Sequence, residues 1–453
     1  MSEQAMQWTR LLSRARLGRR EERRDSDARS AFQRDFDRIV FSSAFRRLQD
    51  KTQVFPLARN DYVRTRLTHS LEVSSVGRSL GTLVGEVVIQ RHRLQDVVAA
   101  DFGTIVAAAC LAHDIGNPPF GHAGEDAIRL WFRDTSRGQA ALAPLTPAER
   151  QDFLRFEGNA QGFRLLTRLQ SPDNPGGMQL TCAVLGTFSK YPRAGWSEQP
   201  LPDAVAYRKF GFFQEDADSF HQLAAELGLP AMADAAWLRH PLAYLVEAAD
   251  DICFRIIDIE DGFRLGLLDY QEVLERLLPL AGGKRVEARL ATLSRPKERV
   301  EYLRARAISL MVEEVQQCFL EHEPALLEGV LAQELLDLIP SAAALAGLRQ
   351  LAEEQVYVAQ PVVQVGAGGF EVLGALLAAF VEAVEDLACH GRALSPRSRM
   401  LVHLMPEQFI GPNRVPQDQP YRRLLRITDF VSGMTDSYAV GLFKQITGIS
   451  LAR

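Results

Sequence analysis

The amino-acid sequence predicts an all-α protein with at most a short extended element. An apolar, alanine-rich run at residues 105–112 is typical of a buried helix. A second apolar run with helical spacing begins at Pro241, a residue that suits the first helical position, and continues to about Glu260. The last third of the chain consists mainly of helical patterns, and within it only residues 356–365 favour an extended segment.

Size and charge limit what the chain can be. Its 453 residues exceed one simple core and indicate either a large single domain or two fused lobes. A hydrophobic content of 47% is enough to bury such a core. The formal net charge of -5 excludes a general nucleic-acid binder, although local basic patches remain compatible with it.

The cysteines and the N-terminus favour a cytoplasmic protein. None of the five cysteines forms a CxxC pair, so the sequence indicates neither a disulfide framework nor a thiolate zinc site. The polar, arginine-rich segment Met1–Arg24 lacks the apolar core of a signal peptide, and no run is long enough to span a membrane. We therefore expect a cytoplasmic location and no membrane partner.

The N-terminal part is basic. Residues 1–30 are rich in Arg and Glu, and we favour a solvated helix or a frayed arm there. The alternative is an anion-binding arm for nucleic acid or a neighbouring subunit. Residues 31–58 carry apolar residues at helical spacing, with Arg46 and Arg47 at the edge of that face. These arginines are either ordinary surface residues or a phosphate-binding pair.

The central helix ends in an unusual way. It stops at His113 and Asp114, where Gly116 is expected in the left-handed conformation and two prolines prevent continuation. Further helices are expected at about residues 69–88, 124–132, 155–170, 181–188, 268–279, 297–323, 325–338, 343–355, 370–389 and 421–446. Connections are expected at residues 133–152, 192–208 and 391–420, and a chain break at glycines 366, 368 and 369.

Four residues are candidate metal ligands. His69 lies among apolar neighbours, where a lone His is more often a satisfied core residue unless partners exist elsewhere. His113 and Asp114 are such partners, and Asp250 is a carboxylate inside an apolar helix, which is costly unless it is paired or metal-bound. Two imidazoles and two carboxylates suit a divalent first-row metal with positions left for water or a substrate oxygen. Because no Cys takes part, structural zinc is disfavoured.

Other polar residues suit phosphate chemistry. His122 and Glu125 are spaced i, i+3 at the start of the next helix and form a candidate pair that activates water and handles its proton. Lys190 near a helix end and Lys209 beside aromatic residues have ordinary explanations, since a Lys can complement a helix dipole or cover apolar surface. Lys and Arg side chains would also neutralise a phosphate chain.

The pattern His69, His113-Asp114, Asp250 resembles that of the HD-domain metal phosphohydrolases. The resemblance is much closer to one branch, the deoxyguanosinetriphosphate triphosphohydrolases. The matching motifs are residues 43–55 (SAFRRLQDKTQVF), 64–69 (RTRLTH), 113–122 (HDIGNPPFGH), 247–252 (EAADDI) and 433–436 (GMTD). The bare ligand pattern is moderately specific, whereas the NPPFGH and FRRLQDKTQVF segments are highly specific.

This resemblance implies a fold, an assembly and a reaction. It implies an all-helical HD-domain core at residues 36–265, preceded by an arginine-rich arm at 1–35. A helical region at 266–453 would pack on the core and contribute to a homo-oligomer, often a hexamer. The implied reaction is hydrolysis of a dNTP, dGTP among them, to deoxynucleoside and inorganic tripolyphosphate, with water attacking the α-phosphorus. A divalent metal, Mg²⁺ or Mn²⁺, is the implied cofactor.

Residue roles follow from the same resemblance. His69, His113, Asp114 and Asp250 would bind the metal. His122 and Glu125 would assist catalysis. Lys190 and Lys209 would bind the phosphates, with support from Arg46 and Arg66.

The sugar contacts follow in the same way. Gln53 and Asp258 would contact the deoxyribose, Gln53 through the 3′-hydroxyl. Phe254 and Asp258 lie on one helix face with Asp250. The family often has Tyr where this chain has Phe254, and Phe keeps only the bulk, so discrimination against ribonucleotides is left open.

Two other classes of function compete with this interpretation. An HD-type nucleotidase or phosphodiesterase needs only the metal core, whereas residues 36–56 would be superfluous to it. A nucleic-acid-binding regulatory protein would use the arginine-rich arm and the basic start of the tail near residue 421 as its surface. Single-stranded DNA is the ligand expected in that case, and its binding would be compatible with the enzyme.

Overall fold

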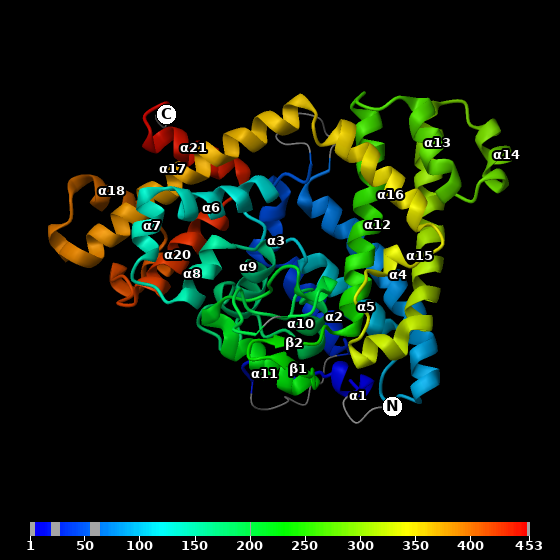
Figure 1. Ribbon diagram of the computed structural model, residues 1–453, viewed down its shortest axis with the longest axis horizontal. Coiled ribbons are helices and arrows are strands. Elements are labelled where there is room, and N and C mark those ends of the chain that lie inside the picture. The colour runs from blue at the N-terminus through cyan, green and yellow to red at the C-terminus, as the bar shows by residue number, and fades with distance from the viewer. Residues whose placement is uncertain (1–4, 20–27, 55–63, 200, 451–453) are drawn as a thin grey trace.

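A computed structural model describes residues 5–19, 28–54, 64–199 and 201–450. Helices make up most of it, and β1 and β2 are its only strands within these ranges (Figure 1). The predicted all-α class is confirmed. None of the described helices has the length and apolar character needed to cross a membrane.

Helices α1 to α11 precede a short antiparallel sheet. Their bounds, with those of the strands, are α1 Trp8–Leu11, α2 Ala31–Val40, α3 Ser43–Arg47, α4 Arg66–His92, α5 Ala99–Ala112, α6 His122–Asp134, α7 Ser136–Leu142, α8 Pro147–Leu154, α9 Gly158–Arg164, α10 Cys182–Phe188, α11 Ala217–Leu227, β1 Ala231–Ala233 and β2 Ala236–Trp237. The remaining helices are α12 Pro241–Arg264, α13 Tyr270–Leu280, α14 Lys284–Thr292, α15 Pro296–Glu328, α16 Ala342–Leu351, α17 Gln360–His390, α18 Pro396–Leu404, α19 Glu407–Ile410, α20 Pro420–Ser432 and α21 Asp436–Ile446.

Helices α4 and α5 pack antiparallel and unusually close. A Cβ built on Gly77 would lie 2.5 Å from Cys110 Sγ, and one on Gly81 would lie 2.7 Å from the carbonyl oxygen of Phe102. Side chains at these positions would push the two helices apart, because interiors are close-packed. The glycines therefore bring the start of α4 beside the end of α5, where the candidate histidines lie.

The predicted helix at Pro241 is α12, and it covers this pair. It packs against α4, α5 and α15. His240 caps it by accepting a hydrogen bond from the backbone of Leu242, and Pro241 occupies its first turn, where a backbone N–H is not needed. Helix α12 thus carries Asp250 to the same place as the end of α5.

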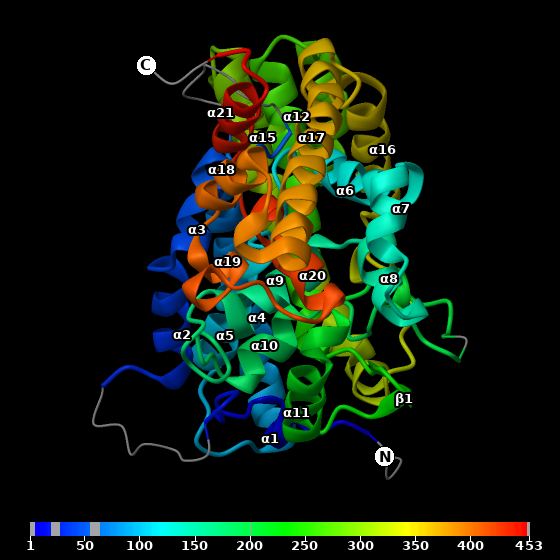
Figure 2. The ribbon, with the colours of Figure 1, turned by 90° about the vertical axis from the view of Figure 1, so that its left-hand side faces the viewer.

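A second core joins the C-terminal helices to α6–α8. Buried aromatic residues such as Phe132 and Phe153 pack there in one cluster with residues of α17 and α20, among them Phe380 and Phe430. Figure 2 shows α17 with α6 and α7 on one side and α18 and α21 on the other. The C-terminal helices therefore pack against α6, which begins within the 113–125 segment.

Two sequence predictions are wrong because Thr, Pro and Gly residues that occur within or at the start of helices were expected to interrupt them. Residues 133–152, expected to be a connection, contain α7 and α8, and their Thr and Pro residues start these helices. Thr146 and Glu149 form a capping box, and Pro147 follows as the first helical residue.

The expected extended segment at 356–365 is also wrong. Helix α17 begins at Gln360 and runs through all three glycines that were expected to break the chain. Gly369 lies against the ring of Phe120, where an added Cβ would be 2.9 Å from ring carbons. Close packing, and not a chain break, accounts for that glycine.

Other boundaries differ in the same region. Helix α15 continues through Pro324 to Glu328, so the α-helix expected at 325–338 is replaced by the end of α15 and one short 3-10 turn at Leu335–Asp337. The connection at 391–420 contains α18 and α19, and the tail expected as one helix from residue 421 is divided into α20 and α21.

The N-terminal segment is not a solvated arm where the structure describes it. Trp8 and Leu11 are buried, and the indole nitrogen of Trp8 donates a hydrogen bond to buried Glu323 at 2.7 Å. Arg16 pairs with buried Asp35. These contacts hold residues 5–19 against the body of the protein, while residues 1–4 and 20–27 lie outside the described ranges.

Buried polar contacts tie the C-terminal helices to the loop before α6. Asp436, 2% exposed at the start of α21, accepts hydrogen bonds from the backbone of Thr52 at 2.9 Å and of Phe120 at 3.0 Å. The Thr52 hydroxyl also donates to it. One carboxylate thus joins three segments that are far apart in the sequence.

Lys51 makes the second tie. Its ammonium group donates to the carbonyl oxygens of Asn117 and Ser432. Burial lowers the pKa of Lys51 to about 7. A lysine so deeply buried is costly, so the two carbonyl contacts are needed to hold it.

Replacing Asp436 should destabilise the whole protein. The Asp436→Ala variant would leave the buried N–H groups of Thr52 and Phe120 without an acceptor, and we expect the free energy of unfolding to fall by about 3 kcal/mol. Urea denaturation followed by circular dichroism measures it. Ser437→Ala is the control, because it removes only an exposed hydrogen bond to Asp50 and should change stability by about 0.5 kcal/mol or less. Equal losses in both variants would contradict this role.

Candidate metal centre and catalytic pair

Three predicted ligands form a buried cluster. His69 comes from the first turns of α4, and His113 and Asp114 follow the end of α5. One potential ligand atom from each of the three lies within 4.8 Å of the others. Asp250 joins them from α12, with its Oδ1 3.1 Å from His69 Nε2 and 3.3 Å from His113 Nε2.

The tautomer of His113 fits metal binding. Its Nδ1 lies 2.7 Å from the carbonyl oxygen of Cys110, an arrangement in which Nδ1–H donates to the carbonyl. The lone pair of Nε2 is then directed at the carboxylates of Asp114 and Asp250. Two imidazole nitrogens and two carboxylates form a donor set that suits a divalent first-row metal, so the residues present fit such an ion.

Asp114 is held by two neighbours. Arg66 Nη1 donates to its Oδ2 at 2.6 Å, and Asn117 Nδ2 donates to its Oδ1 at 2.5 Å. Burial disfavours the charged carboxylate, but the charges of Arg66 and His113 outweigh it and hold the pKa of Asp114 well below its usual range. Arg66, expected to support phosphate binding, therefore contacts a predicted ligand.

Asp250 has a cationic partner of its own. Lys190, two residues beyond α10, donates to Asp250 Oδ2 at 2.7 Å. Although burial opposes ionisation, Lys190 and His113 hold the pKa of Asp250 well below its usual range. The two carboxylates in turn raise the pKa of His113 against the effect of burial. The cluster thus favours positive charge, which a metal ion would supply.

His122 and Glu125 form the pair that their spacing predicted. His122 Nδ1 lies 2.9 Å from Glu125 Oε2, and the backbone of Gly158 donates to Glu125 Oε1 at 2.6 Å. Burial disfavours its charge, but the hydrogen bond to His122 and the charge of Lys209 lower the pKa of Glu125. Glu125 is buried and His122 is largely exposed. A carboxylate therefore fixes one ring nitrogen and leaves Nε2 facing outward.

The turn between the cluster and this pair differs from the prediction. Gly116 does not adopt the left-handed conformation, and positive φ angles occur instead at Phe120 (φ 64°) and Gly121 (φ 59°). Gly116 is instead needed because a Cβ there would lie 2.1 Å from the backbone of both Gly158 and Gly162. The turn at Gly116 therefore packs directly against α9, and this contact brings the backbone N–H of Gly158 within hydrogen-bond distance of Glu125.

Arg66 connects the cluster to the turn. An added Cβ at Gly121 would lie 2.5 Å from Arg66 Nη2, so the guanidinium that binds Asp114 also touches the residue before His122. The predicted ligands and the predicted catalytic pair are thus neighbours through one side chain.

Lys209 lies on the side of Glu125. Its Nζ is 3.7 Å from Glu157, which also pairs with Arg129 at 3.0 Å. Burial and the nearby charge of Glu125 raise the pKa of Glu157 to about 7. Lys209 is 36% exposed, so its cation can reach a ligand beside the His122–Glu125 pair.

Tyr357, which the sequence did not point to, contacts the α12 face that carries Phe254 and Asp258. Tyr357 donates its hydroxyl hydrogen to Asp258 at 2.8 Å and stacks on Phe254 with ring centroids 5.6 Å apart. Burial raises the pKa of Asp258 to about 8. Tyr357 was missed because it lies in the segment expected to be extended, and only its aromatic character in a helical context would have pointed to it.

The remaining predicted substrate residues make few contacts with the cluster or the catalytic pair. Gln53 is partly buried, and its Oε1 has no hydrogen-bond partner in the described part of the chain. Arg46 is exposed on α3, and no ion pair joins it to the cluster within the residues described. Asn117 and Lys51 were not singled out, although both lie in the quoted motifs.

Two domain families match the chain. Residues 66–143 match the HD domain, and residues 340–445 match the phosphohydrolase-associated domain. The first match includes three residues of the cluster and the His122–Glu125 pair, and the second runs from α16 to α21. HD domains are metal-dependent phosphohydrolases, in agreement with the buried His-His-Asp cluster.

Relatives match over nearly the whole length. A deoxyguanosinetriphosphate triphosphohydrolase-like protein of Synechocystis sp. is 46% identical over 455 residues, covering 98% of this chain and 100% of the relative. One of Pseudomonas aeruginosa is 43% identical over 452 residues, covering 98% and 99%. The deoxyguanosinetriphosphate triphosphohydrolase of Salmonella enteritidis is 32% identical over 483 residues, covering 92% and 94%. The two domains, the buried cluster and these full-length matches together establish that the chain belongs to the deoxyguanosinetriphosphate triphosphohydrolase family of HD-domain phosphohydrolases.

Proposed function

We propose that the protein hydrolyses deoxynucleoside triphosphates, dGTP among them, to deoxynucleoside and inorganic tripolyphosphate. The observation that carries this proposal is the buried His69, His113 and Asp114 cluster, with Asp250 beside it and the His122–Glu125 pair next along the chain. The names of the relatives support the substrate class. A nucleotidase with only a metal core would not need the phosphohydrolase-associated domain that this chain carries.

The four candidate ligands would hold one divalent ion, Mg²⁺ or Mn²⁺. When bound, such an ion polarises a phosphoryl oxygen and lowers the pKa of water. Arg66 and Lys190 keep Asp114 and Asp250 ionised, so both carboxylates are ready to bind a cation. One role of these two basic residues is therefore to prepare the donor set.

The catalytic pair would manage the proton. Glu125 accepts the Nδ1–H of His122 and fixes the ring, so that Nε2 faces the substrate side with a free lone pair. Water adds to the α-phosphorus, the bond to the 5′-oxygen breaks, and that oxygen needs a proton. His122 can take the proton of the water and return it to the 5′-oxygen, while Glu125 stabilises the imidazolium.

Substrate contacts would come from three sides. Lys190 and Lys209 neutralise phosphate oxygens, with Arg46 and Arg66 in support, as the family resemblance implies. Gln53 and Asp258 hold the sugar, and the unpartnered Oε1 of Gln53 is free to accept the 3′-hydroxyl within the described residues. Phe254 supplies bulk beside the sugar, and the stacked Tyr357 adds the hydroxyl that Phe254 lacks.

Organisation beyond the site stays a prediction. The division at residues 35 and 265 and assembly into a homo-oligomer such as a hexamer rest on the resemblance, and a cytoplasmic location rests on the cysteines and the N-terminus. Single-stranded DNA stays a candidate ligand of the basic segments.

The reaction class is tested by product analysis. The purified protein is incubated with each dNTP and rNTP in the presence of Mg²⁺ or Mn²⁺, and the products are separated by ion exchange. We expect tripolyphosphate and deoxynucleoside from dGTP or another dNTP. Pyrophosphate or monophosphate as the inorganic product would contradict the proposal.

Loss of a ligand should abolish turnover without unfolding the chain. In His113→Ala or Asp250→Ala, we expect tripolyphosphate release to fall by about 1,000-fold or more, with helical circular dichroism unchanged. Asp251→Asn is the matched control on α12, because Asp251 pairs with Arg255 away from the cluster and its loss should leave the rate within about three-fold of the original. Full turnover in a metal-saturated ligand variant would contradict the ligand set.

Removing the charge of Glu125 should affect chemistry more than metal binding. For Glu125→Gln, which keeps the side-chain volume, we expect kcat to fall by about 100-fold or more because His122 loses its anionic partner. Steady-state kinetics and a Mn²⁺ titration of the same variant separate the two effects. A large loss of Mn²⁺ affinity with kcat unchanged would argue against a catalytic role.

Tyr357 should matter for the sugar. In Tyr357→Phe the stacking on Phe254 is kept and only the hydrogen bond to Asp258 is lost, so we expect kcat/KM for the best dNTP to fall about ten-fold. The ratio of kcat/KM for that dNTP to that of its rNTP should also fall. Unchanged kcat/KM for both substrates would place the Tyr357–Asp258 pair outside the site.

A further inference from the structure

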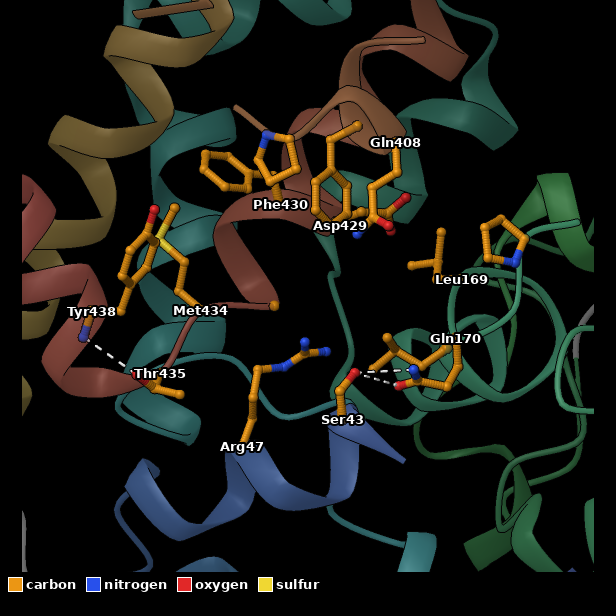
Figure 3. Close-up of a pocket in the computed structure, with 15 residues that line it drawn as sticks. Ser43, Arg47, Leu169, Gln170, Gln408, Asp429, Phe430, Met434, Thr435 and Tyr438 are labelled. Carbon is orange, nitrogen blue, oxygen red and sulfur yellow. Dashed lines mark hydrogen bonds between the residues drawn. The ribbon is translucent and has the colours of Figure 1, made fainter. Parts of the chain in front are cut away.

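A cavity of about 480 Å³ lies away from the candidate active site. It is enclosed by α3, by the helical turn at 165–169 that follows α9, by α19, and by the joint between α20 and α21. Figure 3 shows Ser43 and Arg47 on one side and Phe430 and Met434 on the other. None of the predicted metal, catalytic or substrate residues lines it. Its volume is in the range of small-molecule sites, which is roughly 300–1,000 Å³.

Arg47 places an uncompensated charge in this cavity. Its side chain extends from α3 into the open space (Figure 3). Burial lowers the pKa of Arg47, yet no carboxylate or hydrogen-bond acceptor contacts its guanidinium among the residues that the structure describes. Arg47 is partly buried, and withdrawing a cation even partly from water without a partner is costly, so an anion beside Arg47 would be favoured.

A second, polar cavity adjoins the first. Its volume is about 260 Å³, and Leu169, Pro172 and Gln408 line both cavities, so the two form one recess. Four arginines line the second part, namely Arg164, Arg168, Arg422 and Arg426.

The charges of the second part are only partly balanced. Three of its arginines pair with Glu215, Asp216 or Asp429. Arg426 donates only to the backbone oxygen of Gln408, at 3.3 Å, and forms no ion pair in the described chain. Burial lowers the pKa of Arg426, and Arg164 and Arg168 add to that effect, while the charges of Asp429 and Glu215 oppose it. The recess therefore carries a second cation that no carboxylate contacts directly within the described residues, although two carboxylates lie near it.

We propose that this recess binds a small organic phosphate. Leu169, Phe430, Met434 and Tyr438 offer apolar and aromatic surface to a body of the size of a sugar or nucleoside. The guanidinium groups of Arg47 and Arg426 can each donate two parallel hydrogen bonds to a phosphate. An apolar ligand would leave both cations unpaired, and inorganic phosphate would leave the apolar wall unfilled.

A chain of hydrogen bonds connects the recess to the metal centre. Its wall includes Gly433, Met434 and Thr435, the residues between α20 and α21. The residue before this joint, Ser432, and the residue after it, Asp436, are the two attachment points of Lys51 and Thr52.

The same contacts continue to the candidate ligands. Lys51 also holds the carbonyl of Asn117, whose side chain binds Asp114, and Asp436 holds the backbone of Phe120. A ligand that fixes the joint would therefore also fix the loop that carries half of the candidate metal centre. Occupancy of the recess and metal affinity should be coupled, and by linkage the effect is reciprocal.

The binding test does not depend on the proposed reaction. Isothermal titration calorimetry is performed on the full chain with three probes: glucose 6-phosphate, deoxyadenosine monophosphate and inorganic phosphate. We expect at least one of the two organic phosphates to bind more tightly than inorganic phosphate. In metal-free buffer its affinity should be equal in the original protein and in His113→Ala, because the recess shares no residue with the metal cluster.

Variants of the recess identify where the probe binds. Arg47→Gln and Arg426→Gln should each weaken binding of the organic phosphate about ten-fold or more, which corresponds to the loss of one charged contact. Arg306→Gln is the control, because it removes the same charge from an exposed position on α15 and should leave the affinity unchanged. Met434→Trp, which fills the apolar part, should block binding, and thermal unfolding verifies that each variant is folded.

The outcomes that overturn the proposal are distinct. If neither organic phosphate binds at millimolar concentration, the proposal is wrong. Binding that is lost in His113→Ala but kept in Arg47→Gln would place the probe in the metal centre. Equal weakening by Arg47→Gln and Arg306→Gln would reduce the effect to net charge. If binding is confirmed, a saturating organic phosphate should tighten Mn²⁺ binding in the original protein, and no change in Mn²⁺ affinity would refute the coupling.

Discussion

The close approach of α4 and α5 is the constraint on which the site depends. Glycines at positions 77 and 81 let the two helices pack almost backbone to backbone, and this brings His69 at the start of one helix beside His113 at the end of the other. Helix α12 packs on both and adds Asp250. A side chain at position 77 or 81 would push the two helices apart and so displace the candidate ligands.

Burial of the carboxylates determines what surrounds them. Asp114 is buried and Asp250 is partly buried, which disfavours an isolated anion at either position, yet Arg66 and Lys190 hold both in the charged form. The two basic residues compensate the anions from one side, and a metal ion would do so from the other. In the recess beside α3 the charges are reversed. Arg47 is a partly buried cation there, and the proposed phosphate would be its anionic partner.

The sequence was informative where chemistry conflicts with local structure, and misleading at glycines and prolines. His113 at a helix end and Asp250 inside an apolar stripe were conspicuous, so the residues that the structure brings together could be predicted. Gly116 and Gly369 were taken for turn signals, although tertiary packing against α9 and Phe120 is what requires them. Tyr357 was missed because its segment was expected to be extended and because its partners, Phe254 and Asp258, lie on α12, about a hundred residues earlier in the chain.

The proposed reaction requires that a single water attacks the α-phosphorus and that tripolyphosphate is released intact. The most direct test is turnover of dGTP in water labelled with heavy oxygen, followed by mass spectrometry of the separated products. We expect one labelled oxygen in tripolyphosphate and none in deoxyguanosine. Label in deoxyguanosine, or labelled monophosphate and pyrophosphate in place of tripolyphosphate, would contradict it.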